Sequence, residues 1–423
     1  MHFWYRLFTY LFFPFSKIYL FIRKIKKKEH FARYKEKLSK IDVNRGEGFL
    51  IWLHVASVGE AMSILPLLDD FEKEKKIDRI LITSITLSSG KILEKKYKEN
   101  KKIIHQFLPL DIPIFVNKFL NHWSPNLSIF IESEIWPNLI FQTKERNIPL
   151  LLINARITKK TFTKWKFLKK FAKKIFEKFD LCVASNTETE NYLRELGAVN
   201  IKNHGNLKFA KANINNNLDQ NLLKKIKNRK IWVASSTHNP EEILCGEAHL
   251  KIKETYKNLL TIIIPRHIER SKTIINNLNK LNLKSITYSN IENLNDTTDI
   301  LLIDTYGESL KFYNVSKSVF LGKSLIASLI NDSGQNPIEA SRLGCKIYHG
   351  PNVSNFSEIY AHLKSLKVAT LVNNSLDLSK HIENDLKTDK VNNSEIIQKI
   401  EQYGLNALTN VLKEIKIYIN TKR

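Results

Sequence analysis

Short apolar runs alternate with longer amphipathic stretches along most of this chain, and this alternation is the feature that most restricts its fold. Each run is bounded by loop-forming residues and followed by a segment with helical spacing, which is the pattern of parallel α/β layers. The runs expected to be buried strands are Phe49–Val55, Arg79–Thr83, Leu127–Ile131, Leu150–Asn154, Leu181–Ala184, Ile231–Ser235, Leu260–Ile264, Ile300–Ile303 and Ser318–Leu321. The sequence therefore predicts an α/β protein with doubly wound parallel sheets.

The chain is long enough for two domains. Its 423 residues suit two domains of roughly 150–200 residues each. The polar, Asn-rich segment Asn213–Asn221 has the composition of a linker and divides the runs into an earlier and a later set. We therefore expect two Rossmann-like domains facing a cleft, at residues 39–212 and 213–423, with the last helix able to pack back on the first domain.

The N-terminal part of the chain is apolar and aromatic. Met1–Phe21 is interrupted by Arg6 and Lys17 and is followed by the basic run Arg23–Lys28. A secretory signal peptide needs charges before the apolar stretch and a small-residue cleavage site, and this segment has neither. Basic residues beside an apolar stretch favour the cytoplasmic side of a membrane, near anionic headgroups. We predict a membrane anchor with a basic collar over residues 1–38 and a cytoplasmic location for the rest.

A second basic stretch, Lys159–Phe179, carries apolar residues at helical spacing between its lysines. The apolar positions are Phe162, Trp165, Leu168, Phe171, Ala172, Ile175 and Phe179. This pattern is more often a helix whose apolar face packs on the core while its lysines face solvent. Helices that lie in a membrane interface share it, with aromatic rings toward the acyl chains and lysines near the phosphates. The sequence leaves both interpretations open.

The charge balance indicates an anionic partner. The chain carries 67 Lys and Arg against 42 Asp and Glu, a formal net charge of +25. Phospholipid, a phosphorylated substrate and nucleic acid all fit such a charge. A nucleic-acid-binding protein would show a recognisable module, whereas the basic clusters here are mixed with membrane-seeking aromatic residues, so no nucleic acid is expected. The three cysteines are far apart and predict neither a disulfide framework nor a zinc cluster.

In open parallel sheets, ligands bind beyond the carboxyl ends of the strands, so the residues just after each run are candidates for chemistry. Glu60 follows the first run, after a small-residue turn, at the start of a helix. Its carboxylate could simply cap that helix, because acids are favoured in a first turn. Glu132 and Glu134 directly follow the third run, where two like charges repel unless a substrate or cation uses them.

The later runs are followed by residues that suit an anionic ligand. Ser235–Glu242 combines hydroxyl and amide side chains with a proline suited to the first turn of a helix. Pro265 and Arg266 follow the next run, and a guanidinium group can fork onto a phosphate or carboxylate. Asp304–Ser309 and Gly334–Ala340 follow further runs and could hold a base, a ribose or a phosphate.

Taken in chain order, these segments resemble a known family. They are similar to the successive motifs of the 3-deoxy-D-manno-oct-2-ulosonic acid (Kdo) transferases of lipopolysaccharide synthesis, which are two-domain glycosyltransferases of the GT-B architecture. The resemblance covers nearly the whole chain. The segments that carry it are WLHVASVGE, ESEIWPNLI, NAR at Asn154–Arg156, GNLKF at Gly205–Phe209, ASSTHNPEE, IIPRHIERS, DTYGES, GQNPIEA and NVSNFSEI.

The resemblance implies transfer of Kdo from CMP-Kdo to the lipid A precursor, a tetraacylated, bisphosphorylated glucosamine disaccharide called lipid IVA. It implies an inverting reaction at the cytoplasmic face of the inner membrane, on a protein bound to anionic phospholipid. By motif, Glu60 is the general base, and Glu132 and Lys208 match positions with transition-state roles, although Glu134 lies in the same motif as Glu132. The CMP contacts that it implies are Pro265, Arg266, Gly307, Glu308, Ser309, Asn336, Pro337, Ile338 and Glu339.

No metal and no cofactor besides the donor substrate are expected. The sequence contains no Asp-x-Asp motif of the kind that chelates a metal on a diphosphate-sugar donor, and no His/Cys cluster. Two alternatives stay: a sugar-nucleotide epimerase, which shares the two-domain architecture but does not need an anchor, and a basic nucleic-acid-binding protein, which would explain the net charge. The sequence departs from the usual pattern of the transferase family at Ser309, Lys323 and Gln335.

Overall fold

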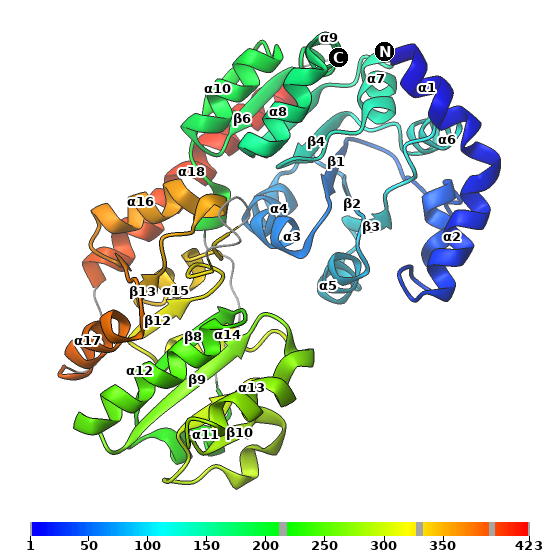
Figure 1. The fold of residues 1–423 in the computed structure, drawn as a ribbon. Helices are drawn as coiled ribbons and strands as arrows, with labels where there is room; N and C mark the ends of the chain where they lie inside the picture. The colour runs from blue at the N-terminus through cyan, green and yellow to red at the C-terminus, as the bar shows by residue number, and fades with distance from the viewer. Residues whose placement is uncertain (1, 211–217, 327–332, 389–393, 422–423) are drawn as a thin grey trace. The chain divides into compact units, whose positions relative to one another are not determined.

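The computed structural model describes residues 2–210, 218–326, 333–388 and 394–421. The chain divides into two compact units, one made of Met1–Ala212 with Tyr403–Arg423 and the other of Asn213–Gln402. Each unit is built on one parallel sheet (Figure 1). The α/β class with parallel sheets, predicted from the apolar runs, is confirmed.

The expected linker is only partly within the described residues. Residues 213–217 of the predicted segment Asn213–Asn221 lie outside them. Asp219 already caps a helix that begins at Gln220, because its Oδ1 accepts hydrogen bonds from the amides of the first helical turn. The end of the predicted linker is therefore the start of a helix.

A seven-stranded parallel sheet forms the centre of the first unit, in the order β3-β2-β1-β4-β5-β6-β7. Its strands are β1 (Leu50–Val55), β2 (Arg79–Ser84), β3 (Ile103–Phe107), β4 (Leu127–Ile131), β5 (Leu150–Ala155), β6 (Leu181–Ala184) and β7 (Ile201–Asn203). β1 pairs in parallel with β2 on one side and with β4 on the other. The strand order therefore reverses between β1 and β4, and the carboxyl ends of these two strands mark the place where such sheets bind ligands.

Helices cover both faces of this sheet, which explains why its strands have continuous apolar runs. One face packs on α3 (Val58–Ser63), α4 (Leu65–Lys73), α5 (Leu87–Tyr97) and the final part of α18 (Ser394–Asn420). The other packs on α6 (Pro113–Trp123), α7 (Pro137–Glu145), α8 (Lys159–Phe167), α9 (Lys169–Phe176) and α10 (Thr187–Leu196). Val411 and Ile415 of α18 are fully buried, so the last helix completes the core of the first unit.

The second unit has its own seven-stranded parallel sheet, in the order β10-β11-β9-β8-β12-β13-β14. Its strands are β8 (Lys230–Thr237), β9 (Leu259–Pro265), β10 (Ser285–Thr287), β11 (Ile300–Leu302), β12 (Ser318–Leu321), β13 (Lys346–His349) and β14 (Ala369–Leu371). Its helices are α11 (Gln220–Ile226), α12 (Glu241–Thr255), α13 (Ser271–Asn279), α14 (Ser309–Asn314), α15 (Ile338–Arg342), α16 (Ser357–Ser365) and α17 (Ser375–Leu386). Here β8 pairs with β9 and β12, so the strand order reverses between β8 and β12.

The N-terminal segment forms two helices, α1 (His2–Leu11) and α2 (Ser16–Ile25), joined by a 3-10 turn at Phe13–Phe15. One side packs on the first unit, where the Tyr5 hydroxyl donates to Asp111 Oδ2 at 2.8 Å. The other side, which we call the N-terminal apolar face, exposes Phe3, Trp4, Phe8, Leu11, Phe15 and Ile18. In the part of the chain that the structure describes, no helix has the length and apolar character needed to cross a membrane. The anchor predicted over residues 1–38 stays a prediction.

The basic stretch Lys159–Phe179 folds as two helices, α8 and α9, that meet at Leu168. The predicted apolar positions are buried in the core of the first unit or, at Trp165 and Leu168, partly buried against it. The interpretation as a core-packed stretch is therefore correct for the five buried side chains, which are not available to a membrane, whereas Trp165 and Leu168 keep part of their surface exposed. Phe167, which the helical spacing left out, is 90% exposed at the corner between the helices.

Candidate active site

Three carboxyl groups lie at the carboxyl edge of the first sheet, where the neighbouring strands β1 and β4 end. Glu60 is on α3, the short helix that follows β1. Glu132 and Glu134 are in the turn between β4 and α7. The topology thus gathers acids from distant parts of the sequence at the place where ligands bind in such sheets.

Glu60 caps the start of its own helix and is almost buried. The Ser57 hydroxyl accepts from the Glu60 amide at 3.3 Å and donates to Glu60 Oε1 at 2.9 Å, so the two side chains together cap the helix. The Ala56 amide donates to Glu60 Oε2 at 2.7 Å. Burial raises the pKa of Glu60 to about 7; the bond from Ala56 lowers this pKa, and the charges of Glu132 and Glu134 add to the rise. The capping role weighed in the sequence is therefore real, and the same carboxyl titrates near neutral pH.

Glu132 has a strained backbone and a lysine partner. Its φ is +57°, in the left-handed region that a glutamate rarely adopts. The Glu132 amide donates to the carbonyl of Ile153 in β5 at 3.1 Å, which holds the turn against the sheet. Its Oε1 lies 2.5 Å from Nζ of Lys208, and both side chains are mostly buried. Strain of this kind persists where the surrounding structure enforces it, and it is concentrated at functional sites.

Two asparagines fix the 3-10 turn Leu207–Phe209 that carries Lys208. Asn206 caps the turn, because its Oδ1 accepts from the Lys208 amide at 2.9 Å. Oδ1 of Asn154, near the end of β5, accepts from the Leu207 amide at 3.0 Å. Asn154 is buried and has a φ of +53°, so the end of β5 is shaped to hold this turn. The ion pair between Lys208 and the acid in the β4 turn is thus held from both sides.

Glu134 is held by two ring N–H groups. Its Oε2 lies 3.1 Å from Nε2 of His54 and accepts from the Trp136 indole N–H at 2.8 Å. A carboxylate only accepts, so Nε2 of His54 carries the proton, while Nδ1 lies 3.0 Å from Thr83 Oγ1. Burial raises the pKa of Glu134, but the bonds from His54 and Trp136 outweigh it and bring this pKa below its usual range. Glu134 therefore stays ionised at a pH at which Glu60 gains a proton.

Sequence reasoning did not single out His54 or Asn154. Both are buried, with 0% and 1% of their surface exposed, near the carboxyl ends of β1 and β5. The signal that would have found them is a polar residue at the end of an otherwise apolar run, since that is where the sheet meets its ligand.

The first unit therefore contains the groups that a proton transfer needs. The surroundings of Glu60 and Glu134 move their pKa values in opposite directions, which is how active sites separate acid and base roles. A carboxyl with a pKa of about 7 can accept a proton from a substrate near neutral pH. Lys208 adds a fixed positive charge to the same unit, beside Glu132. Glu132 and Lys208, two of the three predicted catalytic residues, are in direct contact.

In the second unit, the predicted residues Pro265 and Arg266 lie at the end of β9. Pro265 is buried and the Arg266 side chain is exposed. The Arg266 amide donates to the Thr237 carbonyl at the end of β8 at 3.0 Å, which aligns the two strand ends. The Glu242 carboxylate on α12 also holds the end of β8. It accepts hydrogen bonds from both terminal guanidinium nitrogens of Arg270, at 2.9 and 3.2 Å, and from the Thr237 hydroxyl at 3.1 Å.

The segment after β11 carries Gly307, Glu308 and Ser309. Gly307 is exposed with a φ of +89°, and a Cβ added there would meet nothing within 4 Å, so a ligand can approach the backbone. Glu308 pairs with Lys311 at 2.8 Å. Ser309 is the first residue of α14. Tyr306, just before these residues, donates to Glu269 Oε1 at 3.0 Å and so joins this segment to the one after β9.

The last predicted group opens α15. Asn336 Oδ1 accepts from the Ile338 amide at 3.1 Å, and Pro337 precedes the helix. Glu339 is exposed in the first turn. All the predicted donor residues thus lie on segments that follow β9, β11 and β12 in the second unit. Among the described residues, no three His, Cys, Asp or Glu side chains form a group that could hold a metal ion.

Comparisons with known proteins agree with each other. Residues 26–211 match a family model described as 3-deoxy-D-manno-octulosonic-acid transferase (kdotransferase). A 3-deoxy-D-manno-octulosonic acid transferase of Rickettsia bellii is 33% identical over 97% of this chain and 95% of its own length. Proteins of the same name from Rickettsia felis and Haemophilus influenzae also match.

Two solved structures show the similarity of fold. A glycosyltransferase of Rickettsia africae has a TM-score of 0.52 at 15% identity, covering 89% of this chain and all of its own. A UDP-GlcNAc 2-epimerase of Neisseria meningitidis, bound to UDP-GlcNAc, has a TM-score of 0.56 at 12% identity, covering 87% of this chain and all of its own. At these identities the likeness concerns the fold alone.

Proposed function

This chain belongs to the 3-deoxy-D-manno-octulosonic acid (Kdo) transferase family, and we propose that it moves Kdo from CMP-Kdo to the lipid A precursor lipid IVA. Membership makes the protein a glycosyltransferase of the kind that transfers Kdo in lipopolysaccharide synthesis. The proposal adds the donor, the acceptor, an inverting course and the residues that carry out the reaction.

The observation that carries this proposal is the Glu60 carboxyl, which has a pKa of about 7 and lies at the sheet edge that also holds the Glu132–Lys208 pair. Ionised Glu60 takes the proton from an acceptor hydroxyl. The hydroxyl oxygen then bonds to the anomeric carbon of Kdo, while the bond between that carbon and the phosphate oxygen of CMP breaks and CMP leaves with the electron pair. Attack opposite the leaving group inverts the carbon and needs no enzyme nucleophile.

Charge develops at two places in this reaction. The anomeric carbon becomes oxocarbenium-like, and the leaving phosphate gains negative charge. In the proposal, Arg266 and backbone amides near Gly307 stabilise that phosphate. The full set of proposed CMP contacts is Pro265, Arg266, Gly307, Glu308, Ser309, Asn336, Pro337, Ile338 and Glu339. No metal ion takes part.

We also place the protein on the cytoplasmic face of the inner membrane, bound to anionic phospholipid. The support is the N-terminal apolar face, which is followed in the sequence by the basic run Arg23–Lys28. Helices of this kind lie in the interface with their aromatic rings toward acyl chains and their cations near phosphates. Phe167 and Leu168 also line a surface hollow with Lys160, Thr163 and Lys164, which has the same mixed character.

The function is tested with purified protein, CMP-Kdo and lipid IVA, by following transfer for wild type and Glu60→Gln. Glutamine keeps the size of the side chain but cannot take the proton, so the transfer rate should fall by about 100- to 10,000-fold. CMP affinity, measured by calorimetry, should stay within twofold. The matched control is Asp377→Asn on α17, because Asn374 and Asp377 form the same kind of cap away from the proposed sites. That variant should lose about 1 kcal/mol of stability or less and keep its activity.

Each outcome of this test has a clear meaning. Near-normal transfer by a folded Glu60→Gln protein would remove Glu60 as the base and make Glu132 or Glu134 the next candidate. Conversion of a UDP-sugar without any acceptor, and no transfer from CMP-Kdo, would favour the epimerase alternative. Loss of transfer in the presence of a chelator would contradict the metal-free reaction.

A further inference from the structure

Glu241 is the first residue of α12 and is fully buried, and no role proposed above uses it. Its carboxylate accepts hydrogen bonds from four backbone N–H groups. These donors are His238 at 2.9 Å and Lys323 at 2.7 Å to Oε2, and Ser324 at 2.9 Å and Leu325 at 3.0 Å to Oε1. Hydrogen bonds to an ionised group are roughly twice as strong as those between neutral groups.

The four donors come from two different loops. His238 lies in the loop after β8, and the other three lie in the loop after β12. β8 and β12 are neighbours in the sheet and mark the point where its strand order reverses. One carboxylate therefore connects both loops at the edge where a ligand of this sheet is expected.

The first residue of the loop after β12 lies so close to the end of β8 that only glycine fits there. A Cβ on Gly322 would lie 2.6 Å from the Ser236 carbonyl oxygen and 2.7 Å from Glu241 Oε2. The next residue, Lys323, has a φ of +57°, a left-handed conformation that needs support from its surroundings. The Lys323 amide donates one of the four hydrogen bonds that Glu241 accepts, so the carboxylate supplies part of that support.

The conformation of Lys323 also affects the residues proposed to contact CMP. The Gly334 amide donates to the Lys323 carbonyl at 2.7 Å, close in sequence to Asn336. A Cβ on Gly334 would lie 2.8 Å from Cα of Val353, which leaves this part of the chain little room to shift. A displacement of the loop after β12 would therefore displace the start of α15 as well.

We propose that Glu241 is a positioning residue for the donor site, whose carboxylate holds the loops after β8 and β12 in the conformation that binds CMP-Kdo. The inference rests on the proposed function, because it takes CMP-Kdo as the donor. Glu241 is enclosed by backbone amides and acts through them, without touching the donor. A glutamine at this position turns an NH2 group toward N–H donors, which leaves buried polar groups unpaired and loosens the loops.

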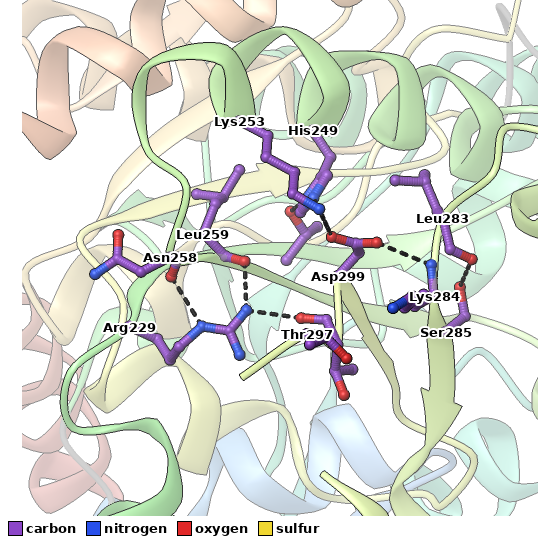
Figure 2. Close-up of polar contacts among 12 residues, drawn as sticks. Arg229, His249, Lys253, Asn258, Leu259, Leu283, Lys284, Ser285, Thr297 and Asp299 are labelled. Atoms are coloured by element: carbon purple, nitrogen blue, oxygen red, sulfur yellow. Dashed lines mark hydrogen bonds and ion pairs between the residues drawn. The ribbon is translucent and has the colours of Figure 1, made fainter. Parts of the chain in front are cut away.

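Asp299 offers a matched control in the same unit. It is also a buried carboxylate, but it stands just before β11, at the opposite edge of the sheet. Figure 2 shows it between Lys253 and the Lys284 amide, with His249 beside it; the amide donates to Oδ2 at 2.9 Å. Lys253 and His249 belong to α12, the helix that Glu241 begins. Asp299→Asn therefore disturbs the same helix away from the proposed donor residues.

The experiment compares wild type, Glu241→Gln, Glu241→Asp and Asp299→Asn in the full chain. For each protein it measures the melting temperature, the calorimetric Kd of CMP and the KM values of CMP-Kdo and lipid IVA. The Kd and KM values are measured at a temperature well below the lowest melting temperature. We expect Glu241→Gln to raise the CMP Kd and the KM of CMP-Kdo by about tenfold or more, with the KM of lipid IVA within twofold. Glu241→Asp, which keeps the charge, should recover part of the affinity. Asp299→Asn should lower the melting temperature and leave the CMP Kd within twofold.

The results separate this inference from the function on which it rests. A folded Glu241→Gln protein with the wild-type CMP Kd would overturn the inference, and so would an equal loss of affinity in Asp299→Asn. If Glu241→Gln does not fold, Glu241→Asp decides: its side chain is one CH2 shorter and cannot keep all four amide bonds, so a wild-type CMP Kd would mean that these bonds do not set donor affinity and would overturn the inference. Wild-type protein that neither binds CMP nor uses CMP-Kdo would overturn the proposed function itself.

Discussion

Two requirements meet in the carboxyl group of Glu60. Its oxygens accept hydrogen bonds from Ala56 and Ser57 at the start of α3, and these bonds favour the ionised form. Burial acts in the opposite direction and prevails, so the pKa is about 7. A general base must be ionised before the reaction and must bind a proton during it, and a pKa near the working pH serves both states.

The pH dependence of kcat/KM follows from this pKa. A base with a pKa of about 7 is protonated and inactive at lower pH, so kcat/KM should rise through about pH 7 and level off above it.

Glu134→Gln removes a negative charge that raises the pKa of Glu60, so the midpoint of the rise should move to lower pH. Burial, the larger cause, is unchanged, so the midpoint should stay above the ordinary range of a glutamate. The Asp377→Asn protein, which should keep the wild-type midpoint, is the control. An unchanged midpoint in Glu134→Gln would mean that the charge of Glu134 does not affect the group that titrates in kcat/KM.

At the residue scale, the motifs named some residues that the structure places in contact, but they did not give all of the contacts. The motifs picked Glu132 and Lys208, and the structure pairs them directly. The bond between His54 and Glu134 joins residues 80 positions apart, and it depends on β1 and β4 being neighbours. Local spacing contains no information about strand order, so this contact could not be predicted.

At the scale of elements, the apolar runs identified nine of the strands that the structure describes and missed the other five, β3, β7, β10, β13 and β14. All nine expected runs form strands. The missed strands β7 and β10 are only partly buried, so they lack a continuous apolar run. β3 contains His105 and Gln106, and β13 begins with Lys346 and ends with His349. A strand can carry these polar residues because of its position in the sheet, and that position cannot be predicted from the local sequence.

The α8–α9 corner shows a second limit of local pattern. Helical spacing continues through Leu168, but that residue has φ of −101° and ψ of 34°, outside the helical range. The break turns the chain, so that Phe167 is exposed while Phe171 is buried in the core. Two phenylalanines of one basic stretch therefore have different surroundings.

A pair of alanine substitutions tests this difference. Phe171→Ala should lower the free energy of unfolding by about 3–5 kcal/mol, because it leaves a cavity in the core. Phe167→Ala should change it by less than about 0.5 kcal/mol, as is usual for exposed positions. Denaturant unfolding of both variants gives the two values. Equal destabilisation would mean that Phe167 is packed against protein.

At the scale of the whole molecule, the net charge of +25 and the N-terminal apolar face lead to one further prediction. The protein should sediment with vesicles containing anionic phospholipid, more weakly with zwitterionic vesicles, and more weakly again in high salt, because salt screens exposed charges. Trp4→Ser with Phe8→Ser should reduce binding to anionic vesicles severalfold, since both side chains are exposed and lose apolar area.

The control for the vesicle experiment is Val199→Ser, which removes an exposed apolar side chain from another part of the first unit. It should bind as wild type does. Equal binding by wild type and the Trp4→Ser, Phe8→Ser protein would contradict a membrane role for the N-terminal apolar face. Equal binding to anionic and zwitterionic vesicles would contradict a role for the charge.

The return of α18 to the first unit also governs the order in which the protein can mature on the ribosome. Translation delivers Met1–Ala212 before Tyr403–Arg423, with the whole second unit between them. Until those last residues emerge, one face of the first sheet lacks the cover that Val411, Leu412 and Ile415 provide. The nascent first unit therefore waits with an open apolar face while the second unit is made, and a chaperone has a defined surface to protect during that interval.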